Sequence, residues 1–194
     1  MPAKRLKRNR EGLELESPRL LLRRVQPADA ESIYAYRSKP DIYKYQSYGP
    51  VTRAKIRRLV AISARTLPDT PGTWYQLAIT LKPTGDLIGD IGIHFIGEWQ
   101  AELGYTLAPR YHGKGYATEA VLLVIAYLFG DLRKHRITAS TDPRNTHSIK
   151  LLERIGMRKE ACFKKSFWTG KAWADDTVYA MLRTEWTANR KKAS

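Results

Sequence analysis

Cysteine is almost absent from this sequence. Among its 194 residues only Cys162 carries a thiol, so no disulfide can form within the chain. The four histidines are scattered, and with one cysteine they do not give the spacing of a zinc site, so we expect no metal. A scaffold held together by disulfides or by structural zinc is therefore excluded.

Long apolar runs are also missing. No stretch approaches the roughly 18–20 apolar residues that cross a bilayer. The N-terminus is basic, but the apolar segment of a secretory signal does not follow it. We find no internal repeat and no low-complexity block either. These absences predict a cytoplasmic protein that does not bind a membrane.

Acidic residues are too few to balance the basic ones. Asp and Glu number 19 against 34 Lys and Arg, which gives a net charge of +15. Residues 1–10 carry +5 and residues 187–194 carry +3, so +7 remains for the rest of the chain. Such a field attracts a nucleotide cofactor, RNA or an acidic protein. Alternatively, the basic tails are merely solvated arms, so charge alone identifies no partner.

The residues that are present predict one mixed α/β domain. We expect a flexible basic N-terminal arm over residues 1–16, a domain over 17–186 and a basic C-terminal tail over 187–194. Hydrophobic periodicity and turn residues place the strands and helices of this domain. Strands are predicted at 19–25, 74–81, 86–96, 100–107, 136–141, 161–169 and 178–183, and helices at 27–37, 52–67, 117–129 and 145–155.

The segment 110–117, Arg-Tyr-His-Gly-Lys-Gly-Tyr-Ala, has the properties of an anion-binding loop. Gly113 and Gly115 allow positive φ and a close approach of the backbone to a ligand. The predicted helix that follows presents its N–H groups and the positive end of its dipole. Arg110 and Lys114 add charge that suits a pyrophosphate. The pattern alone is weak, and an ordinary strand-to-helix turn is the alternative.

A series of motifs surrounds this loop. They are Ser-Pro-Arg-Leu-Leu-Leu-Arg at 17–23, Ile-Gly-Asp-Ile-Gly-Ile at 88–93, Ala-Glu-Leu-Gly-Tyr-Thr-Leu at 101–107, Gly-Lys-Gly-Tyr-Ala-Thr-Glu-Ala at 113–120, Asn-x-x-Ser-x-x-Leu-Leu-Glu-x-x-Gly-Met at 145–157 and Asp-x-Val-Tyr-x-Met-Leu at 176–182. In this order and spacing the sequence resembles the GCN5-related N-acetyltransferases over roughly residues 18–186. It is most similar to the branch that acetylates the N-termini of ribosomal proteins.

The resemblance implies a fold and a cofactor. It implies a mixed, mostly antiparallel sheet of about seven strands, splayed between strands 4 and 5 and flanked by about four helices. Acetyl-coenzyme A, the co-substrate, would lie with its pantetheine arm in that opening, against the strand that ends at Leu107. The residues expected at the cofactor are Tyr105, Thr106, Leu107, Arg110, His112, Gly113, Lys114, Gly115, Tyr116, Ala117, Thr118 and Asn145.

Acetyl transfer to an amine needs a base, because a protein α-amine has a pKa near 8 and a lysine amine one near 10.4. We expect Glu102 to be this base, since the matching family position often carries a carboxylate. Burial within an apolar strand could raise its pKa toward neutrality. The alternative is a Glu on an edge strand that faces water or pairs with a basic side chain.

The acid that protonates the departing thiolate is harder to assign. Many family members use a tyrosine where this chain has Leu152, so the usual acid is missing. Ser148, one turn earlier, is our candidate, and it would have to relay a proton from water. The alternative is a first-turn hydroxyl that bonds the helix backbone. Asn145 is likewise either a helix cap or a hydrogen-bond partner of the pantetheine amide.

The acceptor is the least determined part. The resemblance favours a protein N-terminus, as in a ribosomal protein, and the basic tails could bring the enzyme near RNA. A polyamine or an aminoglycoside is the enzymatic alternative, and it would need a local acidic patch, for which Glu98, Glu102, Asp175 and Asp176 are candidates. A non-catalytic nucleotide- or RNA-binding module is the second alternative. The chain is expected to be a monomer or a homodimer.

Overall fold

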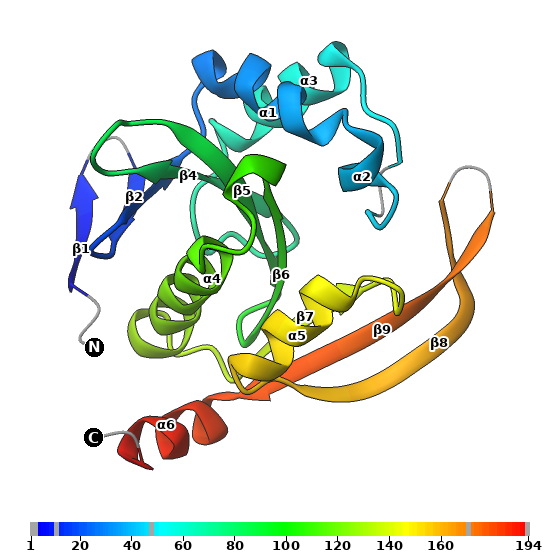
Figure 1. Cartoon of the computed structure of the whole chain (residues 1–194). Helices are drawn as coiled ribbons and strands as arrows, with labels where there is room; N and C mark the ends of the chain where they lie inside the picture. The colour runs from blue at the N-terminus through cyan, green and yellow to red at the C-terminus, as the bar shows by residue number, and fades with distance from the viewer. Residues whose placement is uncertain (1–3, 10–11, 47–48, 170–171, 193–194) are drawn as a thin grey trace.

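One twisted sheet of nine strands runs through the described part of the chain, in the order β1-β2-β3-β4-β5-β6-β7-β9-β8 (Figure 1). The computed structural model describes residues 4–9, 12–46, 49–169 and 172–192. The strands are β1 (Lys4–Asn9), β2 (Gly12–Glu16), β3 (Leu20–Arg24), β4 (Trp74–Leu81), β5 (Leu87–Ile96), β6 (Gln100–Leu107), β7 (Arg136–Thr141), β8 (Arg158–Trp168) and β9 (Trp173–Leu182). All neighbours pair antiparallel except β6 and β7, which are parallel. The mixed, mostly antiparallel sheet predicted from the sequence is confirmed.

Helices cover both faces of this sheet (Figure 1). They are α1 (Ala30–Arg37), α2 (Pro40–Tyr43), α3 (Arg53–Ser63), α4 (Tyr116–Ala126), α5 (Thr146–Arg154) and α6 (Arg183–Lys192). Helices α1 and α3 form a small core with Ala78 of β4, and α4 packs on the opposite face in the main core. Among the described residues, no helix is long and apolar enough to cross a membrane.

The N-terminal segment differs from the expected flexible arm. Within residues 1–16, strands β1 and β2 form a hairpin that continues the sheet beyond β3. Leu13 and Leu15 alternate with charged residues and are buried, with 1% and 6% of their surface exposed. Period-two alternation of this kind is the pattern of a half-buried strand. It spans only five residues and follows a run of basic residues, which by itself favours a solvated arm. Residues 1–3 and 10–11 lie outside the described part.

The C-terminal boundary also differs. The expected tail over residues 187–194 begins inside helix α6, which runs from Arg183 to Lys192. Trp186 anchors this helix, because its ring lies 5.6 Å from the ring of Phe129 in the main core. A single aromatic residue in an otherwise polar helix gives little periodicity, which is why the helix was not predicted. Residues 193–194 lie outside the described part.

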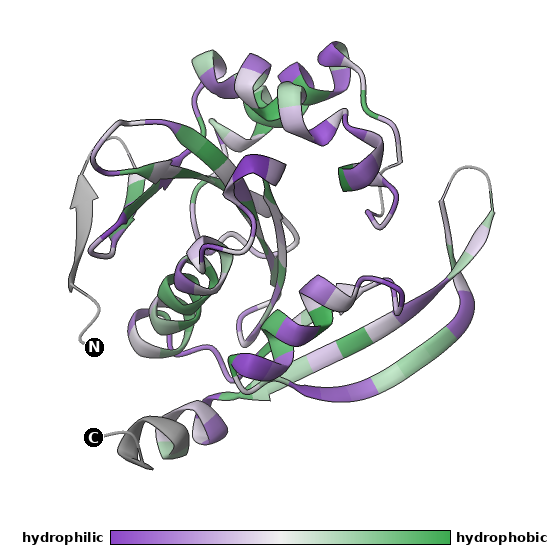
Figure 2. Cartoon of the chain, in the orientation of Figure 1, coloured by the Kyte–Doolittle hydropathy of each residue, from purple (hydrophilic) through white to green (hydrophobic). Residues whose placement is uncertain are grey.

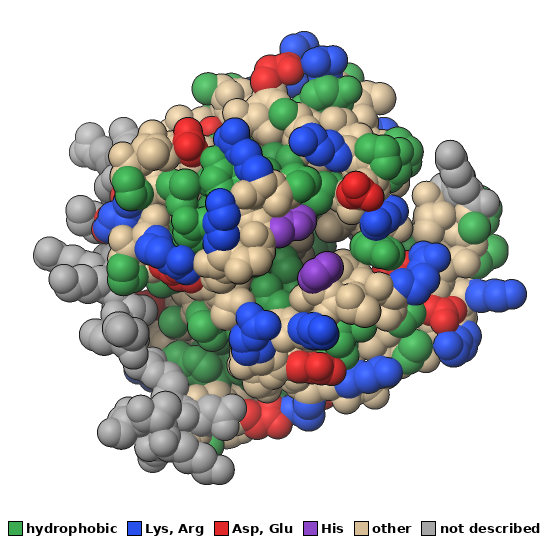
Figure 3. Space-filling view, in the orientation of Figure 1, with side chains coloured by type: hydrophobic (Ala, Val, Ile, Leu, Met, Phe, Trp, Pro, Cys, Tyr) green, Lys and Arg blue, Asp and Glu red, His purple; other side chains and the backbone are tan. Residues whose placement is uncertain are grey.

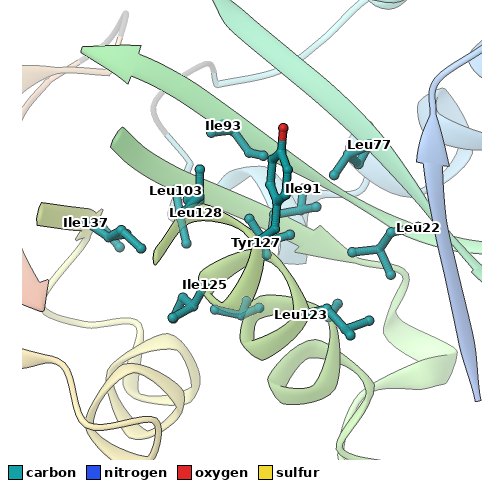
Figure 4. Packing of buried hydrophobic residues seen from close by; sticks show 14 of the residues in the cluster. Leu22, Leu77, Ile91, Ile93, Leu103, Leu123, Ile125, Tyr127, Leu128 and Ile137 are labelled. Atoms are coloured by element: carbon teal, nitrogen blue, oxygen red, sulfur yellow. The ribbon is translucent and has the colours of Figure 1, made fainter. Parts of the chain in front are cut away.

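Helix α4 and the turn after it form the centre of the main core. Figure 2 shows α4 hydrophobic over much of its length, whereas α1 and α3 alternate between hydrophobic and hydrophilic residues. In Figure 4 the side chains of this helix and turn lie against those of the sheet; the labelled ones are Leu123, Ile125, Tyr127 and Leu128 on one side and Leu22, Leu77, Ile91, Ile93, Leu103 and Ile137 on the other. Burying a large apolar side chain stabilises the fold by about 1.5–3 kcal/mol. This packing fixes where α4 begins, and therefore fixes the loop before it.

Strands β6 and β7 separate after a short contact. They pair only where residues 100–102 face residues 136–138, although β6 continues to Leu107 and β7 to Thr141. Beyond Glu102, the β6 edge that faced β7 has no strand partner in the described sheet. These are the fourth and fifth of the strands expected from the sequence, so the predicted splay is confirmed.

Close packing of β5 against β6 depends on Gly89. A Cβ atom on Gly89 would overlap the carbonyl oxygen of Thr106 and lie 3.0 Å from Cα of Leu107. We therefore expect Gly89→Ala to lower the free energy of unfolding by about 1–3 kcal/mol, a typical cost of overpacking. Gly104→Ala is the matched control, because its Cβ would meet only Trp74, at 3.9 Å. Urea unfolding of both variants measures the difference, and equal stability would contradict this account.

Candidate active site

The loop before α4 has the backbone of an anion site. Gly113 and Gly115 both adopt left-handed φ, +75° and +78°, which other residues rarely tolerate. Gly115 is the N-cap of α4, and no side chain caps the helix there. The first N–H groups of α4 therefore keep their capacity to donate, at the positive end of the helix dipole. The alternative of an ordinary turn does not require two left-handed glycines, separated by one residue, at an uncapped helix start.

Basic and aromatic side chains surround this loop. Arg110 and Lys114 are exposed, and both lie over the ring of Tyr111, with 4.7 Å and 5.7 Å to its centroid. The backbone N–H of His112 donates to the carbonyl oxygen of Pro109 at 3.0 Å. Its Nε2 lies 2.9 Å from the carbonyl oxygen of Leu107. His112 thus ties the loop to the end of β6.

The other residues expected at the cofactor lie on either side of the loop. Thr106 and Leu107 are buried at the end of β6, with 5% and 7% of their surface exposed. Tyr116, Ala117 and Thr118 form the first turn of α4 and are half-buried. The structure therefore brings the open edge of β6 and the start of α4 together at one end of the splay.

Glu102 lies on β6 where β6 leaves β7. It is opposite His94 of β5 and Thr138 of β7 in the strand register. Its side chain is 30% exposed, and Oε2 lies 3.6 Å from Nδ1 of His94. The ring of His94 stacks on Trp74 at 4.9 Å. Glu102 is thus a half-buried carboxylate with a histidine neighbour, and it reaches solvent at the mouth of the splay.

Two hydroxyl groups meet across the opening. The hydroxyl oxygen of Tyr105, on β6, lies 2.8 Å from Oγ of Ser148, in the first turn of α5. Burial raises the pKa of Tyr105 to about 12, although the hydrogen bond with Ser148 acts in the opposite direction. Tyr105 therefore keeps its proton at neutral pH. Ser148 bonds a side chain across the splay, and not the helix backbone as the alternative had it.

Asn145 and Leu152 lie on either side of Ser148 along α5. Asn145 is the N-cap, since its Oδ1 accepts the N–H of Ser148 at 3.2 Å. Its side-chain amide N–H groups are not needed for this cap, so Asn145 can still donate to a ligand. Leu152, at the position of the usual tyrosine, is 1% exposed and belongs to the main core.

Sequence reasoning missed two features of the site. The first is Arg19, which bonds both the loop and Glu119 of α4; the sequence shows it only as one residue of the motif at 17–23, with no role at the loop. His94 is the second, because its ring lies beside the Glu102 carboxylate, with 3.6 Å between Nδ1 and Oε2. The alternation of β5 and β6 could have placed His94 and Glu102 on one face, but register between strands is not readable from one sequence.

The aromatic residues at 43–48 and 74–75 that the structure describes lie in different places. Tyr75 is fully buried in the main core, where its hydroxyl contacts Arg24. Trp74 is 45% exposed beside His94. Tyr43 and Tyr45 are half-buried at and after α2, and Tyr48 lies outside the described part. Of the two aromatic residues on β4, only Trp74 can touch an acceptor.

The four acidic residues of the expected patch do not gather as one surface. Glu98 is exposed in the turn between β5 and β6. Asp175 and Asp176 are neighbours on β9, so their side chains point to opposite faces. Asp175 pairs with Lys164 at 2.8 Å. Burial raises the pKa of Asp176 above its usual range, against the effect of a hydrogen bond with Ser140.

Figure 3 shows that the molecule is hollowed between the part that carries α4 and the part that carries α5. Basic side chains surround this hollow, and two histidines lie at its edge. Among the described residues, no three of His, Cys, Asp and Glu group together as metal ligands. A basic hollow next to an uncapped helix start suits a polyanionic ligand such as a nucleotide diphosphate.

A family model described as an acetyltransferase (GNAT) domain matches residues 19–158. The chain is 32% identical to the uncharacterized N-acetyltransferase YnaD of Bacillus subtilis over 175 residues, which cover 90% of this chain and 99% of the relative. It is 34% identical over 88 residues to the [ribosomal protein uS5]-alanine N-acetyltransferase of Escherichia coli, with 45% of each chain covered. The residues that the family model matches include the loop and both strands of the splay, β6 and β7.

Solved structures agree with this match. The GNAT-family acetyltransferase of Bacillus anthracis has a TM-score of 0.80 and 33% identity, over 88% of this chain and 99% of that one. The spermidine N-acetyltransferase of Vibrio cholerae, solved with CoA and spermine, has a TM-score of 0.76 over 88% of this chain and 99% of that one. Its identity is 20%, so that likeness concerns the fold alone. These comparisons support an enzyme and oppose the non-catalytic alternative.

Proposed function

This chain belongs to the GNAT acetyltransferase family, and from that premise we propose that it transfers the acetyl group of acetyl-CoA to the N-terminal α-amine of a protein. The observation that carries the proposal is Glu102, a half-buried carboxylate at the point where β6 and β7 separate. A donor bound along β6 and an acceptor amine would meet there.

Acetyl-CoA, the donor, binds through one set of groups that suits its pyrophosphate and another that suits its pantetheine arm. Backbone N–H groups around Gly113 and Gly115, with the charges of Arg110 and Lys114, suit the pyrophosphate. The open edge of β6 offers backbone groups to the amides of the pantetheine arm, and Asn145 offers its side-chain amide. Acetyl-CoA supplies the thioester whose acetyl carbon the amine attacks.

Glu102 removes the proton that the acceptor must lose. A protein α-amine has a pKa of about 7.7–8.0, so much of it is protonated at neutral pH and cannot attack. A carboxylate within reach of the ammonium accepts that proton and returns it to solvent, because Glu102 is 30% exposed. His94 lies beside this carboxylate, with 3.6 Å between Nδ1 and Oε2.

Tyr105 and Ser148 act on the departing thiolate. An ordinary thiol has a pKa near 8.5, while that of Tyr105 is about 12. Complete proton transfer from Tyr105 is therefore unfavourable, and the pair stabilises the negative sulfur by hydrogen bonding until water protonates it. This role replaces the tyrosine that is absent at Leu152.

Charge pairing favours a single amine over a polyamine. A polycation needs several unpaired carboxylates near the site, but two of the three at this end of β7 and β9 have basic partners, and the third, Asp176, bonds Ser140. Asp142 pairs with Arg144 at 2.6 Å, and Asp175 with Lys164 at 2.8 Å. One carboxylate, Glu102, is enough for an α-amine, so a protein N-terminus fits better than spermidine.

A thiol-release assay with acetyl-CoA tests the proposal. The acceptors are ten-residue peptides with N-terminal Ala or Ser, the same peptides with a blocked α-amine, spermidine and an aminoglycoside. We expect turnover only with the free peptides, and mass spectrometry should place the acetyl group on the α-amine. Faster turnover of spermidine or the aminoglycoside would replace this acceptor with a small amine.

Removing either hydroxyl of the pair tests the thiolate role. Tyr105→Phe and Ser148→Ala should each lower kcat about tenfold, the value of one hydrogen bond to a charged group. Because the two act as a unit, the double variant should lose little more than either single one. Stopped-flow thiol release measures the cycle, with Tyr34→Phe on α1 as the control. Fully additive losses, or no loss, would show that the hydroxyls have no shared role.

A further inference from the structure

Arg19, just before β3, is bound to the start of α4. Its Nε lies 2.6 Å from Oε2 of Glu119, and its Nη2 2.5 Å from the same oxygen. Its Nη1 donates to the carbonyl oxygen of Lys114 at 3.0 Å. Its Cζ lies 4.6 Å from the centre of the Tyr116 ring. One guanidinium thus contacts the loop and the first turn of α4 from a position 100 residues before Glu119.

The bond to Lys114 sets the direction of a peptide group. In a planar trans peptide, the C=O and the following N–H point to opposite sides. Since Arg19 holds the carbonyl of Lys114 on its own side, the N–H of Gly115 is directed to the other side of the loop. This peptide turns over by a change in ψ of Lys114 and φ of Gly115, and Gly115, at φ +78°, would otherwise permit that change.

Arg19 also neutralises a charge that opposes anion binding. Glu119 lies in the first turn of α4, close to the loop that would receive phosphates. Burial acts to raise its pKa, but hydrogen bonds from Ser17 and Arg19 lower it below the usual range, so Glu119 is ionised. Paired with Arg19, this carboxylate no longer cancels the charges of Arg110 and Lys114.

We propose that Arg19 is a positioning residue for cofactor binding, which holds the loop 113–115 in the conformation that receives the pyrophosphate of CoA and masks Glu119. The inference rests on the proposed CoA site. Arg19 itself need not touch the ligand. Its side chain is 48% exposed, so it is not a core residue whose loss would unfold the protein.

The test is the affinity for CoA, measured by titration calorimetry. Arg19→Ala should raise the Kd for CoA about tenfold, as expected for the loss of charge-assisted hydrogen bonds that order a binding loop. Adding Glu119→Gln to Arg19→Ala should recover part of this loss, because the unmasked charge is then removed. Arg57→Ala is the matched control, since it removes one positive charge from an exposed pair with Glu31 on another face.

A donor without the pyrophosphate separates positioning from a general defect. With acetyl-pantetheine as donor, kcat/KM of Arg19→Ala should equal that of the wild type, because the loop has no phosphate to bind. Arg19→Lys should behave like Arg19→Ala at the loop, since a lysine cannot hold Glu119 and the Lys114 carbonyl with one planar fork.

Three results would overturn the inference. They are a Kd for CoA within twofold of wild type in Arg19→Ala, an equal loss in Arg57→Ala, or an equal loss of kcat/KM with acetyl-pantetheine. Circular dichroism at the assay temperature accompanies each titration, and Arg19→Lys serves if Arg19→Ala is unfolded. If the wild type itself does not bind CoA, the proposed function fails, which is distinct from failure of this role for Arg19.

Discussion

Glu102→Gln should lower kcat by about two to three orders of magnitude, the usual contribution of a general base. Glutamine keeps the shape of the side chain and can still contact His94, but it cannot take the proton of the acceptor ammonium. Because Glu102 is not among the groups at the phosphate loop, the Kd for CoA should stay within twofold of the wild type. Steady-state rates with a peptide acceptor and calorimetry with CoA measure the two quantities.

Glu98→Gln is the control for this variant. It makes the same chemical change at an exposed position in the turn between β5 and β6. Its rate should equal that of the wild type. If Glu102→Gln is as fast as the wild type, Glu102 is not the base. If it is slow only because CoA no longer binds, the carboxylate serves the cofactor site and not proton transfer.

Asp90→Ala should cause the largest loss of stability, about 3–5 kcal/mol, which is typical when one partner of a buried ion pair is removed. Asp90 on β5 is fully buried and accepts hydrogen bonds from Arg37, Tyr36 and Gln76. The first two belong to α1, so Asp90 ties that helix to the sheet. Its loss would leave the Arg37 charge buried without its counter-ion. For a chain of this size the midpoint of thermal unfolding should fall by roughly 10 °C.

The matched control is Asp41→Ala, which removes a surface pair with Lys44. Exposed pairs contribute little to stability, so its unfolding curve should overlay that of the wild type. Denaturant unfolding of both variants checks the comparison. A loss of less than 1 kcal/mol in Asp90→Ala would mean that Arg37 finds other partners or reaches water.

Local signals in the sequence were sufficient for the loop and for most elements. Gly113 and Gly115 next to an apolar helix predicted a left-handed, uncapped start of α4, because glycine tolerates that backbone wherever it occurs. Asn145 and Thr52 predicted helix starts for the same local reason, and both cap their helices. Strands with clear alternation, β4 and β6, began and ended where expected.

Elements with weak or masked local patterns were not predicted. Basic residues precede the alternating leucines of β2, and α6 has few apolar residues, so neither element has a clear periodic pattern; Trp186 of α6 packs against Phe129. The leucines of β2 and Trp186 of α6 both pack against the main core, so residues far away in the sequence stabilise both elements. Such tertiary contacts override local propensity, and a single sequence does not reveal them.

The sequence by itself indicated the anion-binding loop, the family resemblance and the candidate Glu102, because these depend on residue types at short spacing. Only the tertiary structure decided which side chains complete the site. Ser148 meets Tyr105 from 43 positions away, and Arg19 meets Glu119 from 100. Pairs so distant are brought together by strand register and helix packing, which the core fixes for the whole domain at once. Residue types in the sequence therefore indicated acetyl transfer, whereas tertiary packing determined which side chains contact Tyr105 and Glu119.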